Sequence, residues 1–211
     1  MAYFPFFIDI EGKSILIVGG GNIALRKTEK ILKFGAGIKV IAPEFCDGLR
    51  AIENVTLIQR KFNDNDIENT FAVISATNDR VLNEHIYKLC TEKNILVNTV
   101  DDIDKCEFIF PSLICRNNVT LGISTNGSAP AFSKYLRKQI EPIIDKNIGM
   151  LNILAESRAW IHKMFHTDEE RAEATSELIN CISGYDFADD SDIIDLLERI
   201  KTSHDNKNRN T

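Results

Sequence analysis

One stretch near the N-terminus decides the fold: it reads Ile15-Leu16-Ile17-Val18-Gly19-Gly20-Gly21-Asn22-Ile23-Ala24. Its first four residues form a short apolar run that three glycines end at once, which is typical of a strand buried on both faces. The residues from Asn22 to Phe34 repeat apolar side chains at helical spacing, and Gly35 follows where a helix would end. The stretch therefore predicts a strand, a tight glycine turn and a helix, in that order.

The turn has the pattern Gly19-x-Gly21-x-x-Ala24 and lies between a predicted strand and a predicted helix, a context typical of a dinucleotide-binding loop. Gly19 would permit the tight turn, Gly21 would let the backbone approach a pyrophosphate, and Ala24 would allow close packing of helix on strand. The free N–H groups where the helix begins, at Asn22 and Ile23, would hold the negative charge. The alternative is a glycine-rich turn that binds no ligand.

The alternation of strand and helix continues along the first half of the chain. Further strands are predicted over 38–41, 55–58, 71–76 and 95–98, with a helix over 80–92. Strands that alternate with helices predict parallel pairing with right-handed crossovers. We therefore expect an α/β protein with a Rossmann-type parallel sheet.

From about Cys106 the order of elements changes. Two strands, Phe108–Phe110 and Val119–Ile123, are predicted on either side of a turn at 115–118, and a helix follows over 129–146. Beyond Gly149 only helices are predicted, over roughly 151–165, 168–181 and 191–200, with a break near Gly184. A small α+β segment and a C-terminal helical domain therefore follow the Rossmann-type sheet.

The composition argues against several classes of partner. The 25 Lys and Arg against 31 Asp and Glu give a net charge of −6, whereas binding to nucleic acid or an anionic membrane needs an excess of basic residues. The five cysteines contain no C-x-x-C pair, so neither a zinc ribbon nor a disulfide framework is indicated. No secretory signal and no run of about 20 apolar residues is present. We expect a cytoplasmic protein with free thiols and neither nucleic-acid nor membrane partners.

Seven short motifs follow one another along nearly the whole chain. They are Phe4-Pro5, Ile17-Val18-Gly19-Gly20-Gly21-x-x-Ala24 with Arg26-Lys27, Val40-Ile41-Ala42-Pro43, Ala76-Thr77-Asn78-Asp79, Asn98-x-Val100-Asp101, Phe108-Ile109-x-Pro111-Ser112 and Ser124-Thr125-Asn126-Gly127-Ser128-Ala129-Pro130. In this order they resemble the precorrin-2 dehydrogenase family, the N-terminal module of siroheme synthases. Some members of this family are also sirohydrochlorin ferrochelatases.

The resemblance implies a homodimer and an organisation in domains. We expect an NAD-binding Rossmann domain over residues 1–110, a dimerisation segment over 111–147, a helical domain over 148–201 and a disordered tail over 202–211. The implied reaction is the NAD-dependent removal of two hydrogens from precorrin-2 to give sirohydrochlorin, on the way to siroheme. The sequence leaves open a bifunctional enzyme that also inserts ferrous iron in the same cleft.

Asp101 is the residue expected to carry the chemistry. It follows the fifth predicted parallel strand at its carboxyl end, where open α/β sheets place ligands, and it corresponds to the catalytic aspartate of the family. Loss of a hydride leaves a cation that must release a proton, and a carboxylate can accept it. The alternative is an aspartate that only caps a helix or a turn, beside Asp102 and Asp104.

Other residues are expected around the cofactor. The acidic residue that usually ends the second strand and binds the ribose is absent, and Pro43 and Glu44 stand near its place, which leaves NAD against NADP open. Thr77 and Asn78 end the fourth predicted strand and are expected beside the nicotinamide, or as caps of the next helix. Arg26-Lys27 is either a solvated helix face or a steering group for carboxylates.

The substrate is expected at a run of small hydrogen-bonding residues before the helix that opens at Ala129-Pro130. The run consists of Ser124, Thr125, Asn126, Gly127 and Ser128. Backbone amides and hydroxyls can converge there on an anion such as a substrate carboxylate. The alternative is plain capping of the helix by Ser128.

Two further interpretations of the sequence concern a metal site at two histidines and a regulatory rather than enzymatic role. His162 and His166 lie four residues apart on a predicted helix and could share one face, but no Glu follows His162 as in a metalloprotease helix, so no metal site is expected. A dinucleotide-sensing Rossmann module that gates a channel or regulator is the alternative to an enzyme. The missing ribose-binding acid, the negative charge and Asp101 at a strand end argue against it.

Overall fold

In the computed structural model, which describes residues 3–182 and 190–209, the strand before the glycines is β1 (Ser14–Val18). It is the central strand of a parallel sheet in the order β3-β2-β1-β4-β5. The other strands are β2 (Gly37–Ala42), β3 (Val55–Gln59), β4 (Ala72–Ser75) and β5 (Leu96–Thr99). From β1 the chain adds β2 and β3 on one side of the sheet and then β4 and β5 on the other. The topological switch point therefore lies between β1 and β4, and α/β sheets bind ligands at such points. The predicted Rossmann-type sheet is confirmed.

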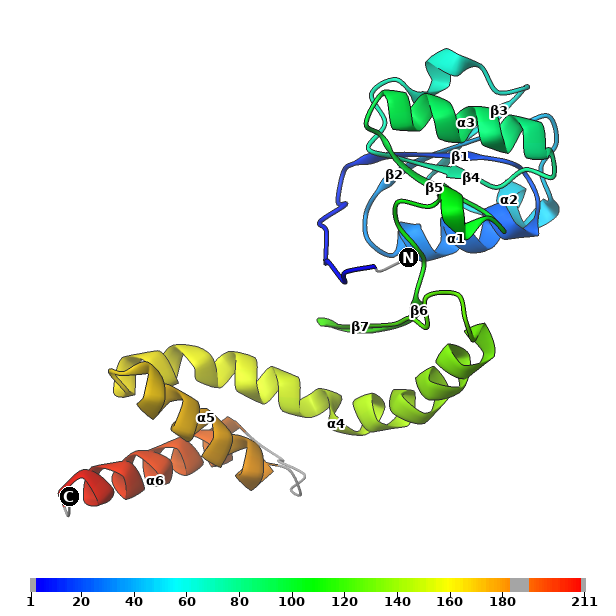
Figure 1. Ribbon diagram of the computed structural model, residues 1–211. Coiled ribbons are helices and arrows are strands. Elements are labelled where there is room, and N and C mark those ends of the chain that lie inside the picture. The colour runs from blue at the N-terminus through cyan, green and yellow to red at the C-terminus, as the bar shows by residue number, and fades with distance from the viewer. Residues whose placement is uncertain (1–2, 183–189, 210–211) are drawn as a thin grey trace. The chain divides into compact units, whose positions relative to one another are not determined.

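Alternate side chains of the strands pack into two apolar cores, one on each face of the sheet. Ile15, Ile17 and Ile74 face α1 (Asn22–Leu32) and α2 (Asp47–Ala51). Leu16, Val18 and Val73 face α3 (Arg80–Glu92) and the 3-10 turn η1 (Asp64–Ile67). Figure 1 shows α1 and α3 on opposite faces. Because both faces are covered, only the edge formed by the carboxyl ends of the strands is left for a ligand.

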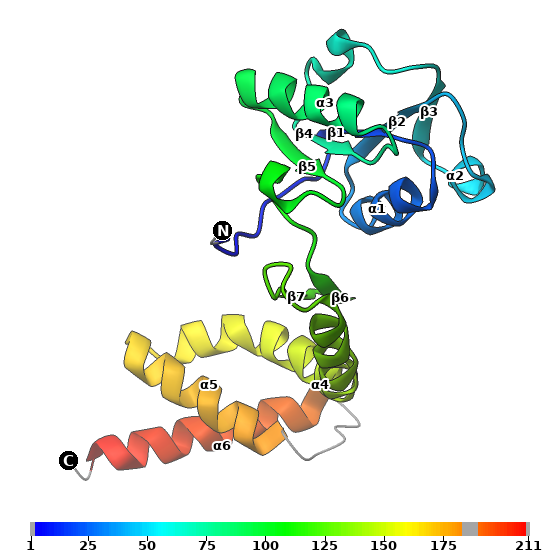
Figure 2. The same ribbon diagram turned by 45° about the vertical axis from the view of Figure 1, so that its right-hand side comes forward.

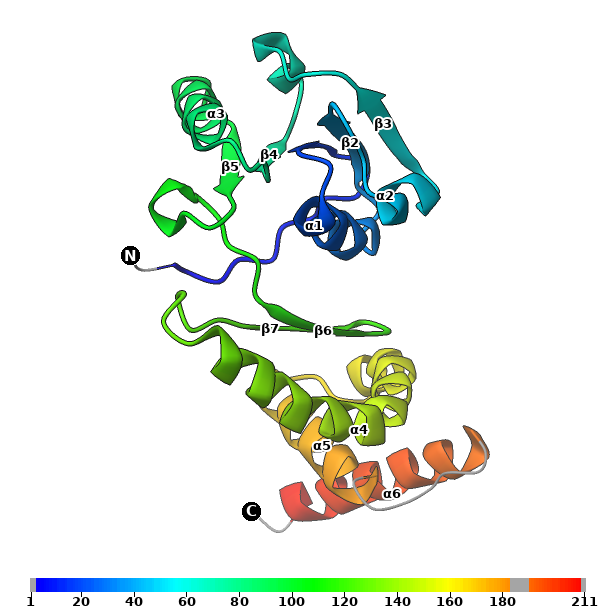
Figure 3. The ribbon, with the colours of Figure 1, turned by 90° about the vertical axis from the view of Figure 1, so that its right-hand side faces the viewer.

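The chain divides into two units. The first comprises residues 1–111 with 125–129 and includes the 3-10 turn η2 (Ile103–Lys105), and the second comprises 112–124 and 130–211. In the second unit, β6 (Ser112–Arg116) and β7 (Val119–Ile123) form an antiparallel hairpin that packs on α4 (Pro130–Met164), as Figure 3 shows. The helices α5 (Asp168–Ile182) and α6 (Asp190–Arg209) complete it (Figure 2). Phe165, Leu178 and Leu197 lie in their shared core.

Several predictions about the second half are wrong. Phe108–Phe110 is not a strand, because Phe108 and Phe110 pack against the α1 side of the sheet, and β6 is the partner of β7 instead. The expected break at Gly149 is absent, since α4 runs through it, and the predicted boundary between residues 147 and 148 therefore falls inside one helix. A single glycine costs a helix only about 1 kcal/mol, which packing on α5 can offset.

The C-terminal end also differs from expectation. The helix α6 continues to Arg209, so residues 202–209 are helical rather than disordered. The predicted break near Gly184 lies outside the described residues. The helix α4 ends at Met164, so His162 and His166 do not share a helix face. In the described part of the chain, no helix has the length and apolar character needed to span a bilayer.

Candidate functional site

The glycine turn after β1 is closed on one side and open on the other. Gly19 has a left-handed φ of 128°, and a Cβ there would collide with the carbonyl oxygen of Ala76. A Cβ on Gly20 would collide with the carbonyl oxygen of Glu44, whereas a Cβ on Gly21 would meet nothing within 4 Å. Gly19 and Gly20 are therefore required by packing, and Gly21 faces open space. The packing role of Gly20 depends on the chain beyond β2, which the sequence pattern did not reveal.

The helix α1 begins at this open space. Its N-cap is Gly21, which supplies no side-chain cap, and its first turn from Asn22 contains no acidic residue. The amides at Asn22 and Ile23 precede the first intrahelical bond, which Leu25 N–H donates to the Gly21 carbonyl at 3.0 Å. Unpaired amides at a positive helix end suit a phosphate. Ala24 is fully buried, as close packing on the sheet requires. These residues fit the pyrophosphate of a dinucleotide.

The end of β2 adjoins the same turn. The Gly19 amide donates to the Ile41 carbonyl at 2.9 Å, and the Cys46 amide donates to the Gly20 carbonyl at 2.8 Å. These bonds hold Pro43 and Glu44, both exposed, beside the glycine turn. The structure therefore brings these two predicted residues next to the predicted phosphate loop.

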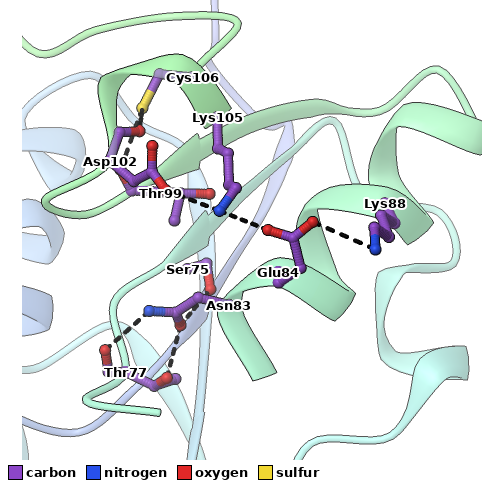
Figure 4. A network of polar contacts seen from close by, with 9 residues as sticks. All are labelled: Ser75, Thr77, Asn83, Glu84, Lys88, Thr99, Asp102, Lys105 and Cys106. Carbon is purple, nitrogen blue, oxygen red and sulfur yellow. Dashed lines mark hydrogen bonds and ion pairs between the residues drawn. The ribbon is translucent and has the colours of Figure 1, made fainter. Parts of the chain in front are cut away.

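The end of β4 forms a hydrogen-bonded turn beside Gly19. Asn83 accepts from the hydroxyls of Ser75 at 2.7 Å and Thr77 at 2.6 Å, and it donates to the Thr77 carbonyl at 3.0 Å (Figure 4). The cap of α3 is Asp79, which accepts from two first-turn amides, so the predicted capping by Thr77 or Asn78 is wrong. Asn78 is left exposed at the sheet edge. Thr77 and Asn78 thus lie where they could border a cofactor.

Asp101 occupies the turn that follows β5. Its φ is 62°, a left-handed conformation that Asp and Asn adopt more readily than other side-chain-bearing residues. Its side chain is exposed and makes no hydrogen bond or ion pair with the described part of the chain, so it is not a capping aspartate. The Val100 amide anchors the turn by donating to the Ser75 carbonyl at 2.9 Å. The exposed carboxylate therefore lies at the edge formed by the carboxyl ends of the strands.

The loop after Asp101 is fixed from both sides. The Cys106 thiol donates to the carbonyls of Thr99 at 3.1 Å and Asp102 at 3.2 Å. Lys105 Nζ pairs with Asp102 at 2.8 Å and with Glu84 of α3 at 2.5 Å, as Figure 4 shows. The hydrogen bonds that Lys105 donates, first to Asp102 and then to Glu84, raise the pKa of Lys105, and the bond from Lys105 lowers the pKa of Glu84. The ion pairs hold Asp102 and leave Asp101 available.

Lys27 is a residue whose environment the sequence did not predict. Arg26 is exposed, but Lys27 is half-buried, with Nζ 3.6 Å from the centre of the Phe110 ring and 3.4 Å from Asn98 Oδ1. Burial, followed by the charge of Lys30, lowers the pKa of Lys27 to about 8, while Cys106 and Asp101 oppose this fall. The sequence feature that could have indicated this environment is Asn98, a polar residue inside an apolar strand.

The predicted substrate run is divided between the units. Residues 125–129 belong to the unit of the parallel sheet, and Ser124 belongs to the other. Gly127, with a φ of 80°, approaches η2: a Cβ there would lie 2.8 Å from Ile103 Cδ1. The Ser128 hydroxyl donates to the Thr125 carbonyl at 2.6 Å, and Thr125 Oγ1 accepts from the Ala129 amide. The predicted capping by Ser128 is therefore wrong, and the run from Thr125 packs beside the loop of Asp101.

The switch-point sheet, the open glycine turn and the uncapped α1 define a nucleotide-binding Rossmann domain. Comparison with known proteins agrees: a family model for NAD(P)-binding domains matches residues 6–112, and one for the central part of sirohaem biosynthesis proteins matches 116–142. The chain belongs to the family of NAD(P)-binding proteins whose model covers residues 6–112, and the resemblance to the precorrin-2 dehydrogenase family is confirmed.

Individual relatives cover the chain to different extents. A siroheme synthase from Pseudoalteromonas translucida is 43% identical over 157 residues, which are 73% of this chain and 33% of the relative. One from Actinobacillus pleuropneumoniae is 37% identical over 169 residues, 78% of this chain and 35% of the relative. The solved structure of SirC, a precorrin-2 dehydrogenase, matches with a TM-score of 0.71 and 25% identity over 95% of this chain and 100% of that one. The chain thus spans about a third of the length of these siroheme synthases.

Proposed function

We propose that this protein is an NAD-dependent dehydrogenase that converts precorrin-2 to sirohydrochlorin in siroheme biosynthesis. The observation that carries the proposal is the match to the precorrin-2 dehydrogenase SirC, because it extends over 95% of this chain and the whole of that one. It therefore includes both the parallel-sheet unit and the helical unit rather than a generic nucleotide-binding domain alone.

The chemistry divides between the cofactor and Asp101. The reaction removes two hydrogens from precorrin-2 to give sirohydrochlorin; a bound NAD would supply the hydride acceptor, and a protein group takes the proton. The exposed Asp101 carboxylate accepts the proton, since it lies at the carboxyl end of β5 and is not engaged in an ion pair within the described residues. The ion pairs of Lys105 and the thiol of Cys106 hold the loop so that Asp101 faces the substrate.

The residues at the edge formed by β1, β2 and β4 would hold NAD. Gly19, Gly21 and the first-turn amides of Asn22 and Ile23 would hold its pyrophosphate, with Ala24 packed beneath, and Thr77 and Asn78 would line the nicotinamide half of the site. Glu44 lies exposed beside the glycine turn with Pro43. A carboxylate there can accept from a ribose hydroxyl but repels a 2′-phosphate, which favours NAD over NADP.

The substrate is a polycarboxylate, and residues 124–128 offer it donors. From Thr125 onward this run lies in the unit that carries Asp101, and Gly127 approaches Ile103. Ser124, Thr125, Asn126, Gly127 and Ser128 are thus proposed to bind substrate carboxylates. Substitution of Asn126 by Asp should weaken substrate binding by charge repulsion while retaining the left-handed φ of 50°.

We propose a homodimer in the cytoplasm. On α4, Phe132 and Tyr135 stack with ring centres 6.3 Å apart, and both are more than half exposed, as is Ile143. Large exposed apolar side chains along one segment are typical of an interface, in agreement with the expected dimerisation segment over 111–147. The five cysteines are all free, as in a reducing compartment. Analytical ultracentrifugation of wild type and Phe132→Ser tests the dimer.

The test of the activity is the conversion of precorrin-2, generated in place, by purified protein and NAD, with NADH and sirohydrochlorin followed by absorbance. Asp101→Asn should lower kcat by about 100-fold or more, because a positioned acid or base contributes about 10²–10⁴-fold. Asn also adopts the left-handed conformation, so this variant should fold normally. The matched control is Asp104→Asn, an exposed aspartate of the same loop. Full turnover by Asp101→Asn would remove this carboxylate from the mechanism.

The same assay separates the proposal from a dinucleotide sensor. A sensor would bind NAD without turning over precorrin-2, whereas the proposed dehydrogenase produces stoichiometric NADH and sirohydrochlorin. Addition of ferrous iron to the accumulated sirohydrochlorin then tests the bifunctional alternative, since iron insertion changes the absorption spectrum of the macrocycle without further NADH.

A further inference from the structure

Lys27 carries a charge that the described part of the chain does not neutralise. Its Nζ makes one long hydrogen bond, 3.4 Å to the amide oxygen of Asn98, and lies over the ring of Phe110. No carboxylate of the described residues lies within ion-pair distance of it. A lysine ammonium has three N–H donors. At least two of them remain for water or a ligand.

The surroundings of Lys27 are those of a built position rather than a chance surface contact. Asn98 is 5% exposed, and its amide nitrogen donates to the Phe108 carbonyl at 2.9 Å and to Cys106 Sγ at 3.3 Å. These bonds fix the amide so that its oxygen faces Lys27. The ring of Phe110 then holds the ammonium from another side at 3.6 Å. A half-buried cation that only neutral groups surround lowers the stability of the folded protein. An anion that binds beside it would compensate for this cost in the ligand-bound protein.

The electrostatic neighbours of Lys27 place it beside the proposed chemistry. Arg26 and Lys30, from its own helix, raise the positive potential at Nζ. Across from them, Cys106 and Asp101 belong to the turn and loop that follow β5, and both favour the charged lysine. Lys27 and the Asp101 carboxylate therefore act on the same region of the sheet edge. A ligand that reaches Asp101 comes within the field of an unneutralised ammonium.

We propose that the Lys27 ammonium binds a carboxylate side group of the tetrapyrrole substrate and thereby orients the macrocycle toward Asp101. This inference rests on the proposed function, since it takes the substrate to be a polycarboxylate. Asn98 and Phe110 hold the ammonium from the protein side and leave its remaining donors for the substrate. Lys27 is thus a specificity-determining residue for an anionic ligand, next to a carboxylate that accepts a proton.

The proposal is tested by binding of sirohydrochlorin, the product, to the full-length protein across pH 6.5–9.5, with affinity measured from quenching of protein fluorescence. Lys27→Met should weaken binding about 10-fold or more at pH 7, because a hydrogen bond to a charged group contributes about 1.5–3 kcal/mol. Wild type should lose affinity as the pH rises through about 8, the pKa of Lys27. Lys27→Arg should retain affinity throughout, because arginine stays charged.

The control variant is Lys33→Met, which removes the same charge from an exposed position at the C-cap of α1. It should bind sirohydrochlorin like wild type, and the affinity for NAD should be unchanged in all variants. Wild-type affinity in Lys27→Met, or the same alkaline loss of affinity in Lys27→Arg as in wild type, overturns the inference. Absence of sirohydrochlorin binding by wild type itself would instead overturn the proposed function.

Discussion

Replacement of Lys27 by Met should stabilise the parallel-sheet unit at neutral pH. Burial lowers the pKa of Lys27 from 10.5 to about 8, so the folded protein holds the charged form less well than the unfolded chain does. Each pKa unit corresponds to about 1.4 kcal/mol, so a fall of about 2.5 units makes the charge cost at most about 3.5 kcal/mol. Partial exposure reduces this figure, and loss of the contact with Phe110 costs about 0.5–1 kcal/mol. The expected net gain is about 1–2 kcal/mol at pH 7.

The direction in which the stability difference between Lys27→Met and wild type changes with pH identifies desolvation of the Lys27 charge as its cause. Below about pH 8 the lysine is charged in both states, and the full cost is present in wild type. Between about pH 8 and 10.5 the folded state has lost this proton while the unfolded state keeps it, so wild type becomes more stable relative to the variant as the pH rises. The stabilisation by Lys27→Met should therefore shrink over that range.

Hydrogen exchange of the buried amides in β1 and β4 measures the unfolding free energy of this unit alone, without a contribution from the helical unit. The difference between variant and wild type is taken at pH 7 and again at pH 9.5, so that other titrating groups cancel. Lys33→Met serves as the control and should show no such difference. A Lys27→Met protein less stable than wild type at pH 7, by an amount independent of pH, would refute the claim that its charge is desolvated.

The remaining predictions concern the glycine turn, the N-cap of α3 and the ion pairs of Lys105 that hold the loop after Asp101. Gly20→Ala should lower stability by about 1–3 kcal/mol, because its Cβ meets the Glu44 carbonyl, as thermal unfolding would show. Gly21→Ala should fold normally but bind NAD about 10-fold or more weakly, equal to about 1.4 kcal/mol by calorimetry, and unchanged affinity would exclude a pyrophosphate at this position. Asp79→Ala should destabilise by about 1 kcal/mol in urea, since two first-turn amides of α3 lose their acceptor. Lys105→Met should lower kcat more than it raises KM, with rescue by Lys105→Arg, and a rise in KM alone would contradict a role in positioning Asp101.

The sheet was predictable because its signals are local. A short apolar run that ends at glycines is sufficient to identify β1, and the bounds of α3 match the sequence prediction because apolar residues repeat along it at helical spacing. The positions of Pro43, Thr77 and Asp101 at one edge follow from a rule, since the carboxyl ends of parallel strands lie together. Topology of this kind needs only the order of the elements.

The second half was harder because its signals depend on tertiary contacts. Phe108 and Phe110 have the alternating pattern of a strand, but they pack against the apolar core on the α1 side of the sheet rather than pairing with another strand. Gly149 reads as a helix end, yet α5 packs along α4 and supplies the stability that the glycine removes. The bend in α4, visible in Figure 3, is consistent with Pro142 inside the helix. Propensity alone cannot weigh these long-range contributions.

The choice among the three neighbouring aspartates shows why the site also needs coordinates. Asp101, Asp102 and Asp104 carry the same carboxyl group, and the sequence prefers Asp101 through its place after the fifth predicted strand and through the family resemblance. In the structure, Lys105 pairs with Asp102 at 2.8 Å, whereas Asp101 makes no ion pair or hydrogen bond within the described residues. Under the proposed mechanism, the ion pair of Lys105 occupies Asp102 and leaves Asp101 available as the proton acceptor. Lys105 lies four residues beyond Asp101, where no motif marks it.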